Sequence, residues 1–216
     1  QDAHDLLTAD EVRALSVAVD RLEAHALERV DQPPRVQSAW GGAYHRDDDL
    51  GYHANGSDKR GETLIIEDFW NAERAFDALL DHDRTLGYIL GVVSARFTIN
   101  NSEIRIRYPE NATGTHMGGP ADHKYRNGFR GDRIDCMMVR MIYFLHDVTN
   151  EQGAFCVVPA THKTNRPSAY SVGVDEEPGM IGLEVKAGDG ILFTENLRHG
   201  GFTNRSDQTR KTIHVG

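Results

Sequence analysis

The sequence has 216 residues, of which 39% are hydrophobic and 26% charged, and its 24 Lys and Arg against 33 Asp and Glu give a net charge of −9. This length suits one domain, and the composition excludes a disordered chain. The acidic balance argues against a nucleic-acid polymer as a partner, and no apolar run approaches the ~18 residues that a membrane helix needs.

The cysteine content and the N-terminus predict the compartment. Two cysteines, Cys136 and Cys156, do not make a disulfide framework in a chain of this length. The N-terminus carries no signal-peptide pattern. We therefore expect a cytoplasmic protein whose partner is a small molecule, while its oligomeric state stays open.

The first part of the chain, residues 1–95, is expected to be mainly helical. Thr8 and Glu11 have the spacing of a helix-capping box, and apolar residues then recur on one helical face as far as Ala26. A pair of prolines, Pro33 and Pro34, ends this helical region.

Three further segments follow within that part. Residues 41–61 are rich in Gly, Asp and His, which predicts a loop, and we interpret 44–60 as a lid over the substrate. Apolar stripes predict a second helix at about 69–81 and a short third one at 84–90.

From about residue 96 the apolar period changes to two, most strictly in residues 103–108. Further strands are predicted at 137–145, 154–158, 182–185, 190–193 and 211–215. Helices followed by short strands predict one α+β domain over residues 1–216. Its core is expected in 96–216 as a double-stranded β-helix (a jelly-roll, cupin-like fold), with the N-terminal helices packed on one face.

Three residues of the strand-rich part can carry chemistry. His116 follows the alternating strand, His199 follows an apolar strand, and Arg210 comes eleven positions after His199. A jelly roll brings distant strands around one cavity, so the two histidines can meet there. Neutral imidazoles suit Fe(II), and an Arg suits a carboxylate. On spacing alone, surface or structural histidines are the more common case, because the chain has 11 His.

Three arginines that alternate with apolar residues also bear on this cavity. Arg105, Arg107 and Arg140 stand on predicted strands, and at least one of them is expected to point into the barrel towards a co-substrate or substrate.

Several motifs from about Phe76 to His214 resemble the phytanoyl-CoA dioxygenase family of Fe(II)/2-oxoglutarate oxygenases. Leu-Leu-Asp-His-Asp-Arg-Thr-Leu-Gly at 79–87 is followed by the first histidine, His116, and then by an aliphatic strand ending in Asp at 142–147. Glu-Gln-Gly-Ala at 151–154 is similar to the family's Glu-Asn-Gly-Pro turn. Pro-Ala-Thr-His-Lys at 159–163 is similar to its Pro-Gly-Ser-His-Lys. Ala-Gly-Asp at 187–189 then leads to the distal histidine, and the Arg follows at the family's spacing.

The resemblance implies a set of ligands and cofactors. It makes His116 and His199 ligands of Fe(II), with 2-oxoglutarate and O2 as co-substrates. Arg210 would anchor 2-oxoglutarate, and Thr113 and Thr203 could hydrogen-bond to it. The family often has Ser two positions after the distal histidine, where this chain has Gly201.

One family ligand is absent from the sequence. The family pattern is His-x-Asp or His-x-Glu, but this chain has Gly118 followed by Gly119. The halogenases of the superfamily have this vacancy, and chloride enters where the acid would ligate. We therefore expect a halogenase. The alternatives are Asp122 as the third ligand, a hydroxylase with water in the open position, and a non-catalytic binding module.

A polar insertion at residues 121–135 follows the first histidine. Its basic and aromatic members are Lys124, Tyr125, Arg126, Arg130 and Arg133. A local group of cations in an acidic chain suits a phosphate or carboxylate, whereas the simpler interpretation is a solvated loop. We expect a free anionic substrate, such as a nucleoside monophosphate of an antibiotic pathway.

Overall fold

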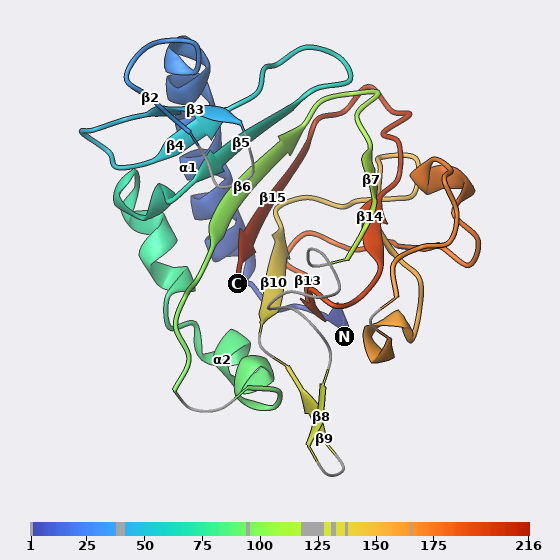
Figure 1. Cartoon of the computed structure of the whole chain (residues 1–216). Helices are drawn as coiled ribbons and strands as arrows, with labels where there is room; N and C mark the ends of the chain where they lie inside the picture. The colour runs from blue at the N-terminus through green and yellow to red at the C-terminus, as the bar shows by residue number, and fades with distance from the viewer. Residues whose placement is uncertain are drawn as a thin grey trace.

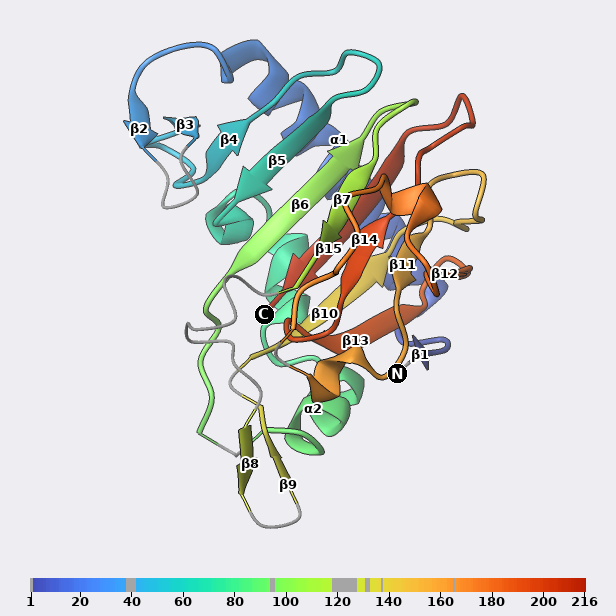
Figure 2. The same cartoon turned by 45° about the vertical axis from the view of Figure 1, so that its right-hand side comes forward.

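The computed structural model describes residues 2–37, 42–93, 96–117, 128–130, 133–136, 138–164 and 166–216. Two antiparallel sheets face each other, as Figures 1 and 2 show. The large sheet has the order β1 (Asp2–Ala3), β13 (Gly190–Thr194), β10 (Val139–Phe144), β15 (Arg210–Val215), β6 (Ser102–Arg107), β5 (Thr63–Glu67), β4 (His53–Asn55), β3 (Ala43–Arg46), β2 (Arg35–Gln37). The small sheet has the order β12 (Ile181–Leu183), β11 (Phe155–Val157), β14 (His199–Gly201), β7 (Thr113–His116).

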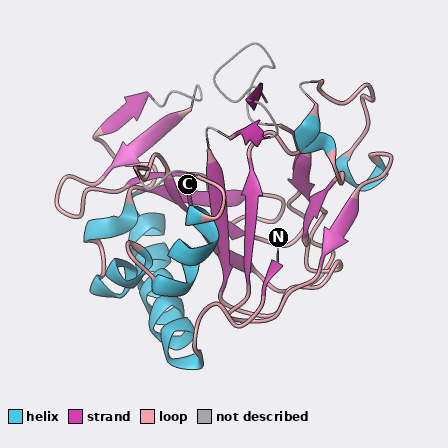
Figure 3. Ribbon diagram, turned by 90° about the horizontal axis from the view of Figure 1, so that it is seen from below, coloured by secondary structure: helices cyan, strands magenta, loops and turns pink. Residues whose placement is uncertain are grey.

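The predicted fold class is confirmed: β13, β10, β15 and β6 form one wall of a jelly roll, and the small sheet forms the other. Two α-helices and two 3-10 turns cover the outer face of the large sheet (Figure 3). They are α1 (Ala9–Arg29), the 3-10 turns η1 (Phe69–Asn71) and η2 (Arg74–Leu79), and α2 (Asp83–Leu90). Two more 3-10 turns, η3 (Thr161–Lys163) and η4 (Val174–Glu176), lie near the small sheet.

Strand alternation divides the hydrophobic core into two parts. On β10, Met141 and Tyr143 pack under the helices, whereas Ile142 and Phe144 point between the sheets and pack with Phe155 of β11. This is the period of two expected for a strand that is buried on both faces. The core therefore has an outer part under the helices and an inner part between the sheets.

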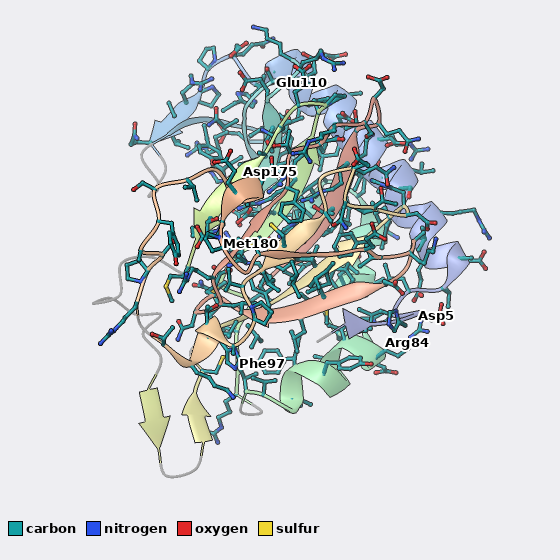
Figure 4. All side chains as sticks on the ribbon, turned by 90° about the vertical axis from the view of Figure 1, so that its right-hand side faces the viewer. Asp5, Arg84, Phe97, Glu110, Asp175 and Met180 are labelled. Atoms are coloured by element: carbon teal, nitrogen blue, oxygen red, sulfur yellow. The ribbon has the colours of Figure 1, made fainter. Side chains whose placement is uncertain are left out.

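The helix α1 begins as predicted. Thr8 is its N-cap, and the Thr8 and Glu11 side chains form a reciprocal capping box. Its buried face includes Leu15 and Ala26 from the predicted stripe. Glu11 also pairs with Arg84 of α2, and Arg84 donates to the carbonyl of Asp5 (both labelled in Figure 4). The two helices are thereby tied to the N-terminal segment.

Two expectations for the first part of the chain are wrong. Residues 44–60 are not a lid: β3 and β4 lie there, hydrogen-bonded into the large sheet, with Tyr44 buried. These strands are too short for a period of two to be recognised among the surrounding Gly and Asp residues. The helix predicted at 69–81 is instead η1 and η2, separated by the extended residue Glu73. This break lets Phe69 and Phe76 both enter the core, with ring centroids 4.7 Å apart.

The strands β8 (Gly128–Arg130) and β9 (Arg133–Asp135) pair as a hairpin that stands away from the two main sheets (Figures 1 and 2). None of the described helices has the length and apolar character needed to span a bilayer.

Candidate active site

Strand pairing brings His116 and His199 together although 82 residues separate them in the chain. They are direct partners in the ladder between β7 and β14, and their ring centroids lie 4.2 Å apart. Phe155 and Phe193 pack against the His199 ring at centroid distances of 5.5 and 4.7 Å. The His199 ring therefore has one apolar side and one side that faces His116.

Backbone carbonyls fix the tautomer of both rings. Nδ1 of His116 lies 2.8 Å from the carbonyl oxygen of Gly114, and Nδ1 of His199 lies 2.7 Å from that of Leu197. A carbonyl only accepts, so each Nδ1 carries the proton and donates it. Each Nε2 then keeps its lone pair, which is the form in which histidine ligates a metal.

The surroundings keep both histidines neutral. Burial lowers the pKa of His199 well below its usual value, and the neighbouring His116 acts in the same direction. Desolvation also lowers the pKa of His116, although part of its ring stays exposed at the open edge of the cavity. Two neutral imidazoles with free Nε2 atoms fit a divalent metal such as Fe(II).

A turn before β14 positions His199. The Thr161 hydroxyl donates to the carbonyl of Val158 at 2.7 Å and accepts the backbone N–H of Arg198 at 2.9 Å. Thr161 belongs to the Pro-Ala-Thr-His-Lys motif at 159–163. The motif therefore holds the residue next to His199, while its own His162 does not line the cavity.

A cavity of about 300 Å³ lies between the sheets beside these histidines. The alternation on β6 turns Glu103, Arg105 and Arg107 inward and Ile104 and Ile106 towards the helices. Arg210 and His214 of β15 face the cavity in the same way. The remaining side chains that line it are Tyr44, Ile65, Glu67, Thr113, His116, Arg140, Phe155, Phe193, Glu195 and His199.

Carboxylates pair with two of the four arginines in the cavity. Glu103 pairs with Arg105, and it accepts from Arg140 at 2.8 Å. Glu195 lies 2.9 Å from Nε of Arg140. Burial alone would raise the pKa of Glu103, but the two guanidinium groups outweigh it and lower the pKa to about 2. This group is therefore a fully ionised network within the wall of the cavity.

Arg210 lies at the floor of the cavity and is 2% exposed. Its guanidinium donates to the carbonyl of Gly153, which belongs to the Glu-Gln-Gly-Ala turn, while its Nε has no partner among the described residues. Burial lowers the pKa of Arg210 to about 10, so it stays charged at neutral pH. A buried cation with a free donor fits a carboxylate ligand.

Some of the other predicted site residues line the cavity, whereas others do not. All three strand arginines, Arg105, Arg107 and Arg140, line the cavity, and so does Thr113. Thr203 does not: its hydroxyl donates to Asp175 at 2.6 Å (labelled in Figure 4). Several candidates lie outside the described residues, namely Gly118, Gly119, Asp122, Lys124, Tyr125 and Arg126. The backbones of Arg130 and Arg133 belong to the β8–β9 hairpin.

Among the polar residues that line the cavity, sequence reasoning did not assign five to the site, which are Tyr44, Glu67, Glu103, Glu195 and His214. A signal existed for His214, because it stands four positions after Arg210 on the same strand and hence on the same face. By the same rule, Glu67 faces the same side of β5 as Ile65. No such spacing pointed to Glu195 or Tyr44, because the segments around them were not expected to line the cavity.

Comparisons with known proteins agree with this architecture. The model of the phytanoyl-CoA dioxygenase (PhyH) family matches residues 3–212. No curated protein matches the sequence. The chain is similar in fold to HygX from Streptomyces hygroscopicus, solved with nickel and 2-oxoglutarate bound, at TM-score 0.72 and 19% identity over 100% of this chain and 81% of that chain.

Two further solved structures share the fold. SnoN, described as the non-heme alpha ketoglutarate dependent epimerase from nogalamycin biosynthesis, has a TM-score of 0.65 at 18% identity, over 99% of this chain and 76% of that chain. AviO1 from Streptomyces viridochromogenes has a TM-score of 0.62 at 16% identity, over 100% and 87% of the two chains.

Proposed function

We propose a site for the chemistry of this chain, which belongs to the phytanoyl-CoA dioxygenase family of iron- and 2-oxoglutarate-dependent oxygenases. In the proposal, His116 and His199 bind Fe(II) and Arg210 binds the distal carboxylate of 2-oxoglutarate. Fe(II) with 2-oxoglutarate and O2 supplies the oxidising power that attacks an unactivated C–H bond of a small molecule.

The observation that carries this proposal is the tautomer of the paired histidines. Two imidazoles meet across a strand ladder, and because each Nδ1 donates to a carbonyl, each Nε2 keeps the lone pair that a metal accepts. Buried polar atoms normally find partners, and a metal supplies one for both.

The remaining cavity residues orient the co-substrate and exclude water. Arg210 provides a fixed positive charge at the floor, so a dianionic keto acid enters with its distal carboxylate first. Phe155 and Phe193 keep water from one side of His199. The charged wall of Glu103, Glu195, Arg105 and Arg140 has two charges of each sign and leaves the rest of the cavity for the substrate.

For the reaction itself we propose chlorination. The support is the sequence: residue 118, two positions after His116, is glycine and carries no ligand. Within the described residues, no three His, Cys, Asp or Glu side chains gather as a metal site. Chloride would take the open position, and the substrate carbon would exchange hydrogen for chlorine.

A second candidate reaction is hydroxylation. Glu195 lines the same cavity as both histidines, and its carboxylate raises the pKa of His116 while desolvation lowers it. Glu195 now pairs with Arg140. A hydroxylase would need Glu195, Asp122 or a water molecule as the third ligand of the metal.

For the substrate we propose a free anionic small molecule, with a nucleoside monophosphate as the specific case. The support is again the sequence, because residues 121–135 gather basic side chains after His116 in a chain of net charge −9.

Anaerobic titration with Fe(II) and 2-oxoglutarate tests the metal site. We expect a weak visible charge-transfer band in the wild-type chain, and its loss in His116→Ala and in His199→Ala. The matched control is His4→Ala, since the His4 side chain is 74% exposed and lies outside the cavity. A band that survives both cavity substitutions, or no band in the wild type, contradicts the proposed site.

Product mass distinguishes the two reactions. Substrate oxidation with chloride present would add chlorine, recognised by its isotope pattern, if the position at Gly118 accepts halide. Addition of oxygen alone would mean hydroxylation and would overturn the chlorination proposal. Nucleoside monophosphates should accelerate decay of the band in O2, and acceleration only by carrier-bound substrates would overturn the substrate proposal.

A further inference from the structure

Two arginines face each other at the floor of the cavity. Arg107 of β6 and Arg210 of β15 are direct partners in the antiparallel ladder, and both side chains line the cavity. Side chains in such a pair have Cβ atoms about 5 Å apart. They are 4% and 2% exposed. The fold therefore places two buried like charges side by side, an arrangement that destabilises the chain unless an anion joins them.

Neither arginine of this pair has a carboxylate partner among the described residues, unlike Arg105 and Arg140. No described residue forms a hydrogen bond with Nε or Nη1 of Arg107 or with Nε of Arg210. Burial lowers the pKa of Arg107 well below its usual value, and the nearby Arg210 acts in the same direction. A bound anion would accept hydrogen bonds from these donors, and its negative charge would raise the pKa of Arg107 again.

The backbone of β14 makes room for the Arg107 guanidinium. A Cβ atom added at Gly201 would overlap Nη1 of Arg107 and would come within 3.0 Å of its Cζ. Gly201 lies two residues after His199 on β14, whose ladder with β7 is irregular between these two residues. The Arg107 head group thus reaches from the large sheet to the small sheet, close to the proposed iron ligand.

We infer that Arg107 is a second anchor for the distal carboxylate of 2-oxoglutarate, acting together with Arg210. The inference rests on the proposed function above. Each guanidinium donates to one oxygen of the carboxylate, which satisfies the free donors and separates the two cations by a negative charge. Gly201 is required because any side chain there would push Arg107 out of this position.

Glutarate is the probe that isolates this contact. It has the distal carboxylate of 2-oxoglutarate but lacks the keto group that would chelate a metal, so its affinity reports the floor of the cavity. Calorimetric titration should give Arg107→Gln about 10- to 100-fold weaker glutarate binding than wild type, as expected for loss of a charge-assisted hydrogen bond. Arg107→Lys should recover only part of that loss, because a single ammonium lacks the fork.

The matched control is Arg105→Gln on the same face of the same strand. Arg105 is paired with Glu103, and its removal leaves Glu103 bonded to Arg140. We expect less than a ~3-fold change in glutarate affinity, because Glu103 already offsets the charge of Arg105 and the field of such a charge is weaker than a direct contact. An equal loss in both variants would mean a general charge effect and would overturn the inference.

A double-mutant cycle tests the role of Gly201. Gly201→Ala alone should weaken glutarate binding because its methyl group displaces Arg107, whereas in the Arg107→Gln background it should have little additional effect. Additive losses would overturn the proposed linkage between Gly201 and Arg107.

Thermal unfolding shows whether the variant merely misfolds. Without ligand, Arg107→Gln should melt at or above the wild-type temperature, since an unpaired buried charge has been removed. Its stabilisation by added glutarate should be smaller than in the wild type. An Arg107→Gln variant that keeps wild-type glutarate affinity overturns the inference while the iron site stands. A wild-type chain that binds neither glutarate nor 2-oxoglutarate overturns the proposed function as well.

Discussion

Glu67 of β5 and Glu103 of β6 lie directly opposite each other on the inner face of the large sheet. Only Glu103 is neutralised, by Arg105 and Arg140. Burial raises the pKa of Glu67 to about 7, and the negative charges of Glu103 and Asp68 act in the same direction. The pair therefore consists of one permanently ionised carboxylate and one that takes up a proton near neutral pH.

This difference predicts how the stability of the chain depends on pH. The pKa of Glu67 is about 7 in the folded chain and 4.5 in its usual environment, so the folded state binds more protons between these values. The contribution of Glu67 to stability is therefore lost as pH rises from 4.5 to about 7. Glu67→Gln removes this loss, because the amide is never ionised.

Urea unfolding at about pH 5 and about pH 8 measures the effect. Relative to the wild type, Glu67→Gln should gain about 1 kcal/mol on going to the higher pH, a value reduced for partial exposure of the group. Comparing the variant with the wild type cancels the opposite contribution of the buried histidines. The control is Glu62→Gln, because Glu62 directly precedes β5 and is exposed. A pH-independent difference would contradict the prediction.

The ionised partner predicts a larger change. Glu103→Gln leaves the guanidinium groups of Arg105 and Arg140 in the cavity wall without their shared carboxylate. Breaking a buried pair from one side costs about 3–5 kcal/mol. Denaturant unfolding should show that loss. Asp48→Asn, which breaks an exposed pair with Arg46, should cost less than about 1 kcal/mol. Equal losses in the two variants would show that the cavity network does not stabilise the fold.

The N-cap of α1 gives a prediction that leaves the site unchanged. Thr8→Ala removes a hydroxyl that accepts the backbone N–H of Glu11 at 3.2 Å, and it should cost about 1 kcal/mol of folding free energy. Thr8→Ser keeps the capping oxygen and should retain most of the stability. Formation of the iron band should be unaffected in both. A loss of the same size in Thr8→Ser would indicate packing of the methyl group rather than capping.

Local sequence patterns predicted the elements whose periodicity is long and regular. The capping box at Thr8, the helix at 84–90 and the alternation in 103–108 correspond to α1, α2 and β6. In each of them, local preference and burial favour the same structure. The short strands β3 and β4 contain only four and three residues, too few for a period to stand out from the Gly and Asp residues around them.

The site could be predicted only in part, because a cavity is defined by strands that are distant in sequence. The sequence suggested that His116 and His199 meet, and the ladder between β7 and β14 places them together. It did not reveal which of Arg105, Arg107 and Arg140 faces inward, because that depends on register. The partner of each arginine is a property of the assembled sheets.

The positioning of His199 by Thr161 gives the last prediction. Thr161→Val keeps the shape of the side chain but removes the hydroxyl that accepts the N–H of Arg198. An unsatisfied buried N–H costs about 1–3 kcal/mol. The start of β14 should then become less well held, and affinity for the metal should fall by about 10-fold, as for other groups that orient a ligand.

Metal titration and urea unfolding of the same samples separate these two effects. Thr161→Ser restores the hydroxyl and should recover both the stability and the metal affinity. Thr164→Val is the control, since the Thr164 hydroxyl accepts the backbone N–H of Arg166, beyond the turn. If Thr161→Val lost stability but bound metal as tightly as the wild type, the hydroxyl would hold the turn without orienting His199, because a ligand held less rigidly must lower the affinity.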